Sequence, residues 1–161
     1  MGAHLRSGAR GLTERPLQYP AFIVHSLTHA VAALTAAAER GCAIVLLSAP
    51  DAGISAGPGW FKALIDAARD AVPAAKFSGI IDCGDDAGAV LGATRAGIET
   101  AIFVGRPDVA ERLAAIAAAA GAHLLTRRPE VVLDLGHWFF ADAETLRRHS
   151  AERLASLRPI C

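Results

Sequence analysis

The most restrictive feature of this sequence is a repeating alternation of short apolar runs with alanine-rich stretches. The apolar runs are rich in β-branched residues, and glycine or proline stands at nearly every junction. Gly41, Gly97 and Gly121 each stand one or two residues before an apolar run, where a helix ends in the left-handed conformation that glycine adopts without strain. The pattern predicts repeated βα units.

Five of the apolar runs are predicted to be strands. They cover residues 22–25, 43–47, 77–81, 100–104 and 123–125, and their starts lie 21 to 34 residues apart, close to one βα unit each. The runs are continuous and not alternating, which is typical of a parallel sheet buried on both faces. The longest interval has its surplus at 49–59, which is predicted to be an inserted loop.

Capping residues indicate where the helices begin. Ser26 can cap a helix over 27–40, Asp85 a helix that reaches residue 96, and Pro107 suits the first turn of a helix over 109–120. After residue 125 the regularity fails. Residues 131–135 can form one more short strand, 138–140 are an aromatic cluster, and a last helix over about 143–157 is expected to pack on this chain or on a neighbour.

The length and composition limit the size of the fold. The chain has 161 residues, of which 53% are hydrophobic and 20% charged, with a mean hydropathy of +0.35, so it should fold compactly. This length suits one domain and falls short of a complete eight-stranded barrel. We expect residues 1–20 to be poorly ordered and 21–161 to form a single domain with a C-terminal extension at about 127–161.

Charge and hydropathy argue against several classes of partner. Sixteen acidic and sixteen basic residues cancel, giving a pI near 7.0, so no nucleic-acid partner is expected. The apolar stretches are far shorter than the roughly 20 residues that span a bilayer, and the first twenty residues contain no continuous apolar segment of a secretory signal. We therefore expect no membrane partner and a cytoplasmic location.

Ligands of parallel α/β proteins bind at the carboxyl ends of the strands, because loops and helix N-termini meet there. The polar or sulfur-containing residues at these positions are His25, Ser26, Ser48, Asp82, Cys83, Arg106, Thr126, Arg127 and Arg128. The arginines can hold an anion through a bidentate fork. Each residue also has a purely structural alternative: a helix cap or loop hydrogen bond for the aspartate and serines, an inert buried thiol for the cysteine, and a solvated side chain for the arginines.

Four segments within residues 21–124 match, in order and spacing, the motifs of one enzyme family. FIVHSL at 22–27 stands where the family has Phe-Asn-Val-Asn-Asn-Leu, and SAPDAG at 48–53, with Ala56-Gly57 and Trp60, is similar to its Ser-x-Gly-Ala loop and following Tyr-x-Gly. IIDCG at 80–84 falls where the family has His-Leu-Asp-His-Gly, and 93–104 is similar to Ala-Ile-x-x-Gly-Phe-x-Ser-Val-Met. The chain thus resembles the N-terminal half of the class II, metal-dependent, ketose-bisphosphate aldolases, as a truncated and diverged relative.

The resemblance implies a fold and a set of site residues. The fold would be α/β, with parallel (β/α) units forming about half of a TIM-type barrel and a C-terminal helix. Asp82 would be the catalytic acid/base, and Cys83, which replaces a histidine ligand of the family, would be a weak metal ligand. Catalytic zinc needs about three protein ligands. The family's glutamate on strand five has no counterpart in 122–126, so zinc is implied only with an incomplete ligand set.

The expected function is an aldolase-like small-molecule site that binds a carbonyl-containing or phosphorylated metabolite. If the protein is an enzyme, the resemblance implies a lyase or isomerase that transfers a proton next to a carbonyl on Asp82, and not a conventional zinc aldolase. The alternative is a non-catalytic, aldolase-derived protein with a ligand-sensing or assembly role. Because a half barrel leaves two sheet edges and an inner face open, we also expect a homo-oligomer.

Overall fold

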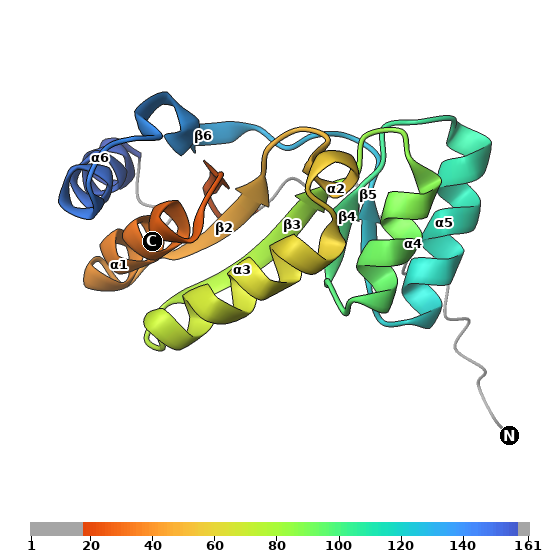
Figure 1. The fold of residues 1–161 in the computed structure, drawn as a ribbon, viewed down its shortest axis with the longest axis horizontal. Helices are drawn as coiled ribbons and strands as arrows, with labels where there is room; N and C mark the ends of the chain where they lie inside the picture. Colours follow the sequence, from red (N-terminus) through yellow and green to blue (C-terminus); the bar gives the residue numbers. More distant parts are fainter. Residues whose placement is uncertain (1–17, 158–161) are drawn as a thin grey trace, which may run out of the picture.

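The computed structural model describes residues 18–157, which contain one six-stranded parallel sheet in the order β5-β4-β3-β2-β1-β6 (Figure 1). The strands are β1 (Ala21–Val24), β2 (Ala43–Ser48), β3 (Lys76–Asp82), β4 (Thr100–Ile102), β5 (His123–Leu125) and β6 (Val131–Asp134). The helices are α1 (Leu27–Glu39), α2 (Ala52–Ser55), α3 (Pro58–Ala71), α4 (Ala87–Arg95), α5 (Pro107–Ala119), the 3-10 helix η1 (Leu135–Trp138) and α6 (Ala143–Ser156). The predicted fold class is confirmed.

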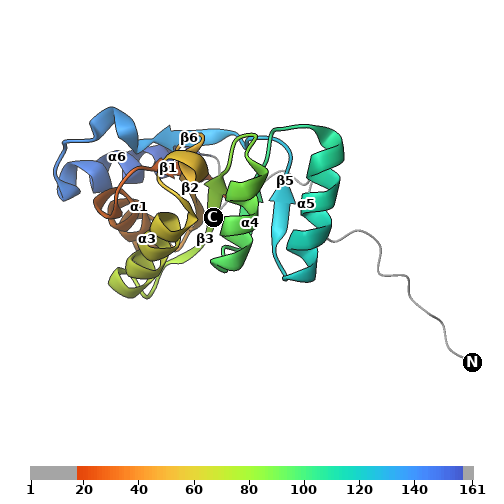
Figure 2. The same cartoon turned by 45° about the vertical axis from the view of Figure 1, so that its right-hand side comes forward.

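Helices cover one face of the sheet only, as Figure 2 shows for α1, α3, α4 and α5. The larger buried cluster joins side chains of these helices, such as Phe61 and Leu113, to strand side chains such as Phe22 and Ile81. The cluster on the other face contains no helical residue; its members are Ala21, Ile23, Val45, Leu47, Ile80, Ile102 and Leu125. One-sided cover is the arrangement of a barrel wall, whereas a doubly wound sheet has helices on both faces.

The sheet is curled, because its two edge strands are joined by a very short segment. Strands β5 and β6 lie at opposite edges, yet only residues 126–130 separate them in sequence. Six Cα steps reach at most about 20 Å, whereas five strand spacings of a flat sheet measure about 24 Å. Since β5 and β6 are not paired with each other in the described part of the chain, the wall is an open half barrel.

The curling also closes the inner face. The seven side chains of the inner cluster are at most 8% exposed, and Ala49 and Val131 pack against them. The expectation of an open inner face is therefore wrong for residues 18–157, because a strongly curled wall brings its inward side chains against one another. A homo-oligomer stays a prediction that this burial does not favour.

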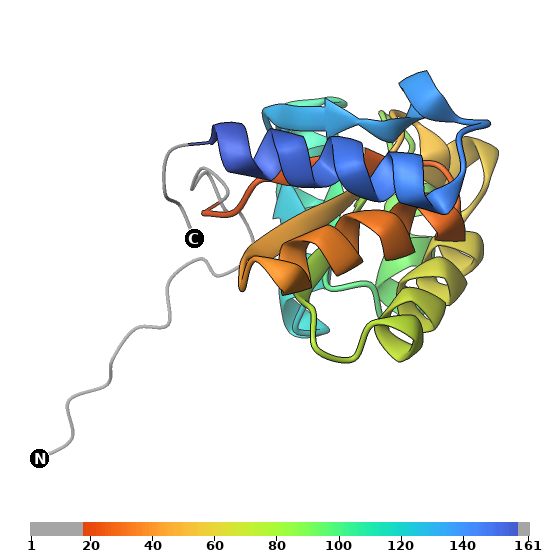
Figure 3. The ribbon, with the colours of Figure 1, turned by 90° about the vertical axis from the view of Figure 1, so that its left-hand side faces the viewer.

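The C-terminal elements complete the edge of the sheet next to β1. Residues 131–134 form β6, which pairs in parallel with β1, so the expected further strand is confirmed. Figure 3 shows α6 lying along α1, where Arg147 pairs with Glu39 at 2.8 Å and Trp138 stacks on His149 with ring centroids 4.4 Å apart. The last helix therefore packs on its own chain.

Most predicted element boundaries hold to within two residues. Gly41, Gly97 and Gly121 have φ between 68° and 77°, which confirms the predicted helix ends. Two details differ: Asp86, not Asp85, caps α4 by accepting a bond from Ala89 N at 2.9 Å, and the predicted loop 49–59 contains α2 and the start of α3.

Two expectations concern the remaining parts of the chain. The segment 1–20 is expected to be poorly ordered, and its residues 1–17 lie outside the described residues. Pro20, at the end of this segment, is described, and its carbonyl accepts a hydrogen bond from Val45 N at 2.9 Å. Within 18–157, no helix combines the length and the hydropathy needed to cross a bilayer.

Candidate functional site at the carboxyl ends of the strands

Asp82, the last residue of β3, is the centre of the site. Its side chain is only 3% exposed, and its Oδ1 accepts hydrogen bonds from the backbone N–H groups of Gly84 at 2.9 Å and Asp51 at 3.1 Å. A carboxylate at this depth is tolerated because it is hydrogen-bonded and paired with a cation. The candidate is therefore built into the end of the strand and is not a free surface group.

Arg128 supplies the cation from the segment between β5 and β6. Figure 1 shows this segment passing along the carboxyl ends of the strands. Arg128 Nε donates to Asp82 Oδ2 at 2.6 Å and Nη2 donates to Asp82 Oδ1 at 3.2 Å. The same Nη2 donates to Asp51 Oδ1 at 3.0 Å. The guanidinium, in a side chain 43% exposed, thus bridges a buried and an exposed carboxylate.

These contacts decide the protonation state of Asp82. Burial alone raises the pKa of a carboxyl group, but the hydrogen bonds from Arg128 and from the N–H groups of Gly84 and Asp51 outweigh it and hold the pKa of Asp82 below its usual value. Asp82 is anionic at neutral pH, and its pairing with Arg128 makes it a weaker base than a free carboxylate.

Two close approaches shape the turn around Asp82. Asp51 adopts a left-handed conformation with φ of 60°, which a short polar side chain tolerates better than a branched one, and it directs its N–H to Asp82. Gly84 has φ of 54°, and a Cβ there would collide with the Asp51 carboxylate. The β2–α2 and β3–α4 loops therefore hold each other in register around the carboxylate.

Ser48 supports Asp82 from the neighbouring strand. It is 1% exposed; its Oγ accepts a hydrogen bond from Asp82 N at 2.8 Å and donates to the carbonyl of Ala49 at 3.1 Å. A buried hydroxyl with both roles filled fixes the end of β3 beside β2. This is the structural alternative that the sequence left open for Ser48, and contact with a ligand stays a proposal.

His25 belongs to a second polar cluster on the same edge. It follows β1, and its Nε2 lies 2.7 Å from Oδ1 of Asp134, the last residue of β6. Asp134 Oδ1 also accepts a hydrogen bond from Gly136 N at 2.8 Å. Burial raises the pKa of Asp134, but the bonds from His25 and Gly136 outweigh this and hold it below its usual value. The two side chains are 26% and 34% exposed.

His29 lies behind this pair in the first turn of α1. Its Nδ1 accepts a hydrogen bond from the backbone N–H of His25 at 3.2 Å, and its own N–H donates to Ser26 Oγ at 3.2 Å. The cap that the sequence predicts for Ser26 is thus confirmed. His29 is 1% exposed, and burial, followed by the nearby His25, lowers its pKa.

Two of the predicted arginines point elsewhere. Arg106 has a side chain 79% exposed and forms a bidentate pair with Asp108 of its own helix, at 2.9 and 3.0 Å. Arg127 is exposed and makes no hydrogen bond or ion pair within residues 18–157. Of the two adjacent arginines after β5, the structure brings Arg128 into the site and leaves Arg127 outside it.

The residues present do not fit a zinc ion. Cys83 is fully buried in the helix-side cluster, where burial, followed by the nearby Asp82 and Asp86, raises the pKa of its thiol to about 12. Zinc binds the thiolate, and residues 18–157 hold no group of three His, Cys, Asp or Glu side chains able to bind a metal. We derive no step through zinc.

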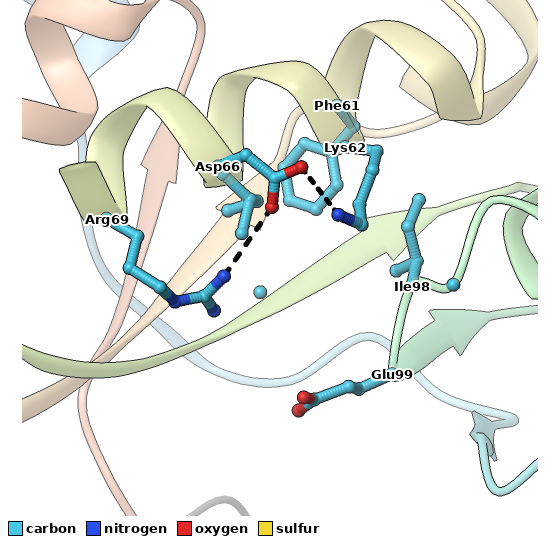
Figure 4. A pocket seen from close by; sticks show the side chains of 9 residues that line it. Phe61, Lys62, Asp66, Arg69, Ile98 and Glu99 are labelled. Atoms are coloured by element: carbon cyan, nitrogen blue, oxygen red, sulfur yellow. Dashed lines mark hydrogen bonds and ion pairs between the residues drawn. The ribbon is translucent and has the colours of Figure 1, made fainter.

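A cavity of about 180 Å³ lies away from this edge. It sits between α3 and the amino end of β4, and Gly79 and Ile98 form part of its lining (Figure 4). Around it, Lys62 and Arg69 both pair with Asp66, at 2.5 and 3.5 Å. These three charges are paired with one another, and Glu99 at the cavity is exposed and makes no ion pair within residues 18–157.

Sequence reasoning missed Asp51 and Asp134. It named Arg127 together with Arg128 as a candidate anion-binding pair, but a sequence cannot tell which of two adjacent arginines faces the sheet. Asp134 closes a short apolar run, as Asp82 does, and that repeated pattern of strand followed by aspartate could have identified it.

Solved structures match the fold of this chain. The crystal structure of a probable tagatose 6 phosphate kinase from Sinorhizobium meliloti 1021 superposes with a TM-score of 0.52 and 15% sequence identity, over 85% of this chain and 45% of that chain. The chain therefore matches less than half the length of that protein, and at this identity the likeness concerns the fold alone. No protein-family model and no curated protein matches the sequence.

Proposed function

We propose that the carboxyl edge of the sheet binds a small carbonyl-containing metabolite, with Arg128 as the group that contacts the carbonyl oxygen. The observation that carries this proposal is the position of Arg128, whose guanidinium is fixed by buried Asp82 yet stays 43% exposed. Such a group presents N–H donors without having to be ordered when a ligand binds. The resemblance to class II aldolases supports the same class of ligand.

The local charges favour a neutral carbonyl over a phosphate at Arg128 itself. One guanidinium faces two carboxylates, Asp82 and Asp51, so the cluster carries an excess of negative charge. A phosphorylated ligand therefore needs a second cation, and exposed Arg127 is the adjacent one. The solved structure with a similar fold bears the name of a sugar-phosphate kinase, which makes sugar phosphates reasonable probes.

The proposal predicts ligand-induced stabilisation that depends on specific arginines. Dihydroxyacetone and dihydroxyacetone phosphate are tested by thermal denaturation, with inorganic phosphate as a control. Saturation at 100 times the dissociation constant adds about 2.7 kcal/mol, or roughly 5 to 10 °C for a chain of this size. Arg128→Gln should lose the shift with both ketones, whereas Arg127→Gln should lose only the advantage of the phosphate. No shift with any probe would contradict the proposal.

For an enzyme, we infer proton transfer next to the carbonyl, in a lyase or isomerase. Asp82 remains a candidate base, weakened by its pairing with Arg128. The thermal measurements are repeated with added zinc, and a shift that requires zinc would overturn our conclusion that these residues do not fit the ion. A cytoplasmic location also stays a prediction, consistent with the absence of a spanning helix in 18–157.

The second candidate function is non-catalytic assembly, favoured by two exposed aromatic rings. Phe140 is 97% exposed and Phe139 50% exposed, and their rings contact edge to face with centroids 5.2 Å apart. Exposed aromatic side chains of this size are typical of interfaces. This candidate needs no ligand at the strand ends.

Light scattering after size exclusion tests the assembly candidate directly. A homo-oligomer held by this pair of rings should dissociate at least tenfold more readily in Phe140→Ser, because a central buried aromatic residue contributes about 2 kcal/mol or more to an interface. Ile116→Ser, at another exposed apolar residue (48% exposed), is the matched control. A wild-type protein that stays monomeric at high concentration would rule out the homo-oligomer.

A further inference from the structure

We infer that His25 is the proton acceptor of this site and that Asp134 is the residue that positions it. The inference rests on the proposed binding of a carbonyl-containing metabolite at the same edge. It assigns the chemistry to a His–Asp pair at the ends of β1 and β6, where Nε2 of His25 and Oδ1 of Asp134 lie 2.7 Å apart, instead of to Asp82, whose carboxylate is paired with Arg128.

The hydrogen bond determines which nitrogen of His25 carries the proton. Asp134 is held as a carboxylate by its partners, and a carboxylate only accepts hydrogen bonds. The proton in the bond therefore belongs to Nε2 of His25, and in the neutral ring the lone pair lies on Nδ1. A carboxylate that fixes the tautomer of a histidine in this way also stabilises the imidazolium formed when the ring accepts a proton.

The lone pair on Nδ1 is available to a ligand. Among residues 18–157, no hydrogen bond to His25 Nδ1 is found, and the one buried side-chain nitrogen or oxygen atom without a partner is Nε2 of His29. Nδ1 of His25 has no hydrogen-bond partner but is not a buried atom, and the side chain is 26% exposed. A base needs this combination of a free lone pair and access to the solvent side.

The surroundings hold the imidazole in one position. A Cβ at Gly136 would lie 2.6 Å from Nε2 of His25, so only glycine permits the close packing of η1 on the ring. On the other side the ring meets His29 edge to face, with centroids 5.9 Å apart. His29 also fixes the backbone of this segment, because its Nδ1 accepts the backbone N–H of His25 at 3.2 Å.

The two polar clusters lie along one edge of the sheet. His25 follows β1 and Asp82 ends β3, and β2 lies between these strands, so their backbones are two strand spacings, about 10 Å, apart. The long side chain of Arg128 and the imidazole of His25 bridge part of this distance, so a small metabolite bound between them can meet both. In the proposed complex Arg128 contacts the carbonyl oxygen and His25 the hydrogen-bearing carbon next to the carbonyl group.

The proposed step is balanced without any further reactant. The bond between hydrogen and the carbon next to the carbonyl breaks, and the proton goes to Nδ1 of His25. The electron pair of that bond forms the carbon–carbon double bond of an enolate, and the carbonyl oxygen takes the negative charge beside Arg128. Return of a proton from the imidazolium to carbon regenerates the ketone and the neutral histidine.

The test measures exchange of carbon-bound hydrogen in heavy water by proton NMR, with dihydroxyacetone and dihydroxyacetone phosphate as probes. The wild-type protein should catalyse loss of the signal. His25→Gln should slow the exchange about 100-fold or more, since general bases contribute factors of this size, while a ligand-induced thermal shift is retained because Arg128 is unchanged. His123→Gln, at an exposed histidine of β5, should exchange at the wild-type rate.

Each outcome separates this inference from the proposed function. Thermal shifts without exchange, or equal exchange in His25→Gln, would overturn the role of His25 and leave ligand binding intact. Nitrogen NMR of the imidazole adds a readout that needs no ligand: the wild type should show Nε2 protonated and Nδ1 bare, and Asp134→Asn should shift this tautomer balance. A wild-type ring with Nδ1 protonated would overturn the inference even if every probe binds.

Discussion

Replacement of Arg128 by leucine should lower the free energy of unfolding by about 2 to 3 kcal/mol at neutral pH. Removal of one partner of a fully buried ion pair costs about 3 to 5 kcal/mol, because the remaining charge is left without compensation. Asp82 is 3% exposed but Arg128 is 43% exposed, so solvent already screens part of the interaction. For a chain of this size the loss lowers Tm by roughly 5 to 10 °C, which calorimetry resolves.

A double-mutant cycle isolates the pair from the packing of the arginine stem. Asp82→Asn keeps an oxygen that can accept from Gly84 N, and should cost about 1 to 2 kcal/mol. The double variant should cost at least about 1 kcal/mol less than the sum of the two, because neither charge is then left alone. Arg127→Leu, at the neighbouring exposed arginine, should change stability by less than about 0.5 kcal/mol. Strict additivity would show that Arg128 acts by packing alone.

The stability difference between wild type and Arg128→Leu should depend on pH. The pKa of Asp82 lies below its ordinary value of 3.8 in the folded protein, so the unfolded chain takes up the proton first as pH falls. The stabilisation from Asp82 is therefore present above about pH 4 and is lost as pH falls through the folded pKa. Since a protonated Asp82 needs no cation, the difference in stability between wild type and Arg128→Leu should shrink toward zero in acid. A constant difference would contradict the ion pair as its cause.

The alternation of apolar runs with glycine-terminated helices was enough to predict the repeated βα units, whereas the half barrel was implied by the resemblance to class II aldolases. Period, run length and the stops at Gly41, Gly97 and Gly121 are local signals, and the structure confirms the helix ends they predict. The curling of the sheet has no such local signal in the sequence. It follows from residues 126–130 joining opposite edges of the sheet, and the sequence alone does not say that β6 pairs with β1. For this reason we predicted an open inner face that the structure buries.

The site was predictable in position but not in its pairings. Asp82, Ser48 and His25 could be placed at one edge because they end or follow strands, and the structure places them there. Their partners Arg128 and Asp134 come from segments 46 and 109 residues away in sequence. No periodicity links such distant positions. Only the folded chain shows that Asp82 forms an ion pair with Arg128 and that His25 is hydrogen-bonded to the carboxylate of Asp134.

Substitution of two glycines within 49–59 distinguishes a glycine required for close packing from one that is required only for its backbone conformation. The ideal position of a Cβ at Gly53, in α2, lies 2.8 Å from Cys83 Sγ and 3.0 Å from the carbonyl oxygen of Asp82. The carbonyl belongs to the backbone and cannot rotate away, so Gly53→Ala has to push α2 from the end of β3. We expect a loss of about 1 to 3 kcal/mol, as for other overpacked positions, measured by urea denaturation.

Gly59→Ala is the matched control, because it adds the same methyl group in the first turn of α3, where nothing lies within 4 Å of the new Cβ. Alanine favours the helix over glycine by up to about 1 kcal/mol, so this variant should be neutral or more stable. Opposite signs would show that Gly53 is required for close packing of α2 against β3. That packing positions Asp51, the residue before α2, whose N–H bonds to Asp82. Gly53→Ala should therefore also weaken the thermal shift by carbonyl probes, whereas equal losses in both variants would assign both glycines to backbone conformation.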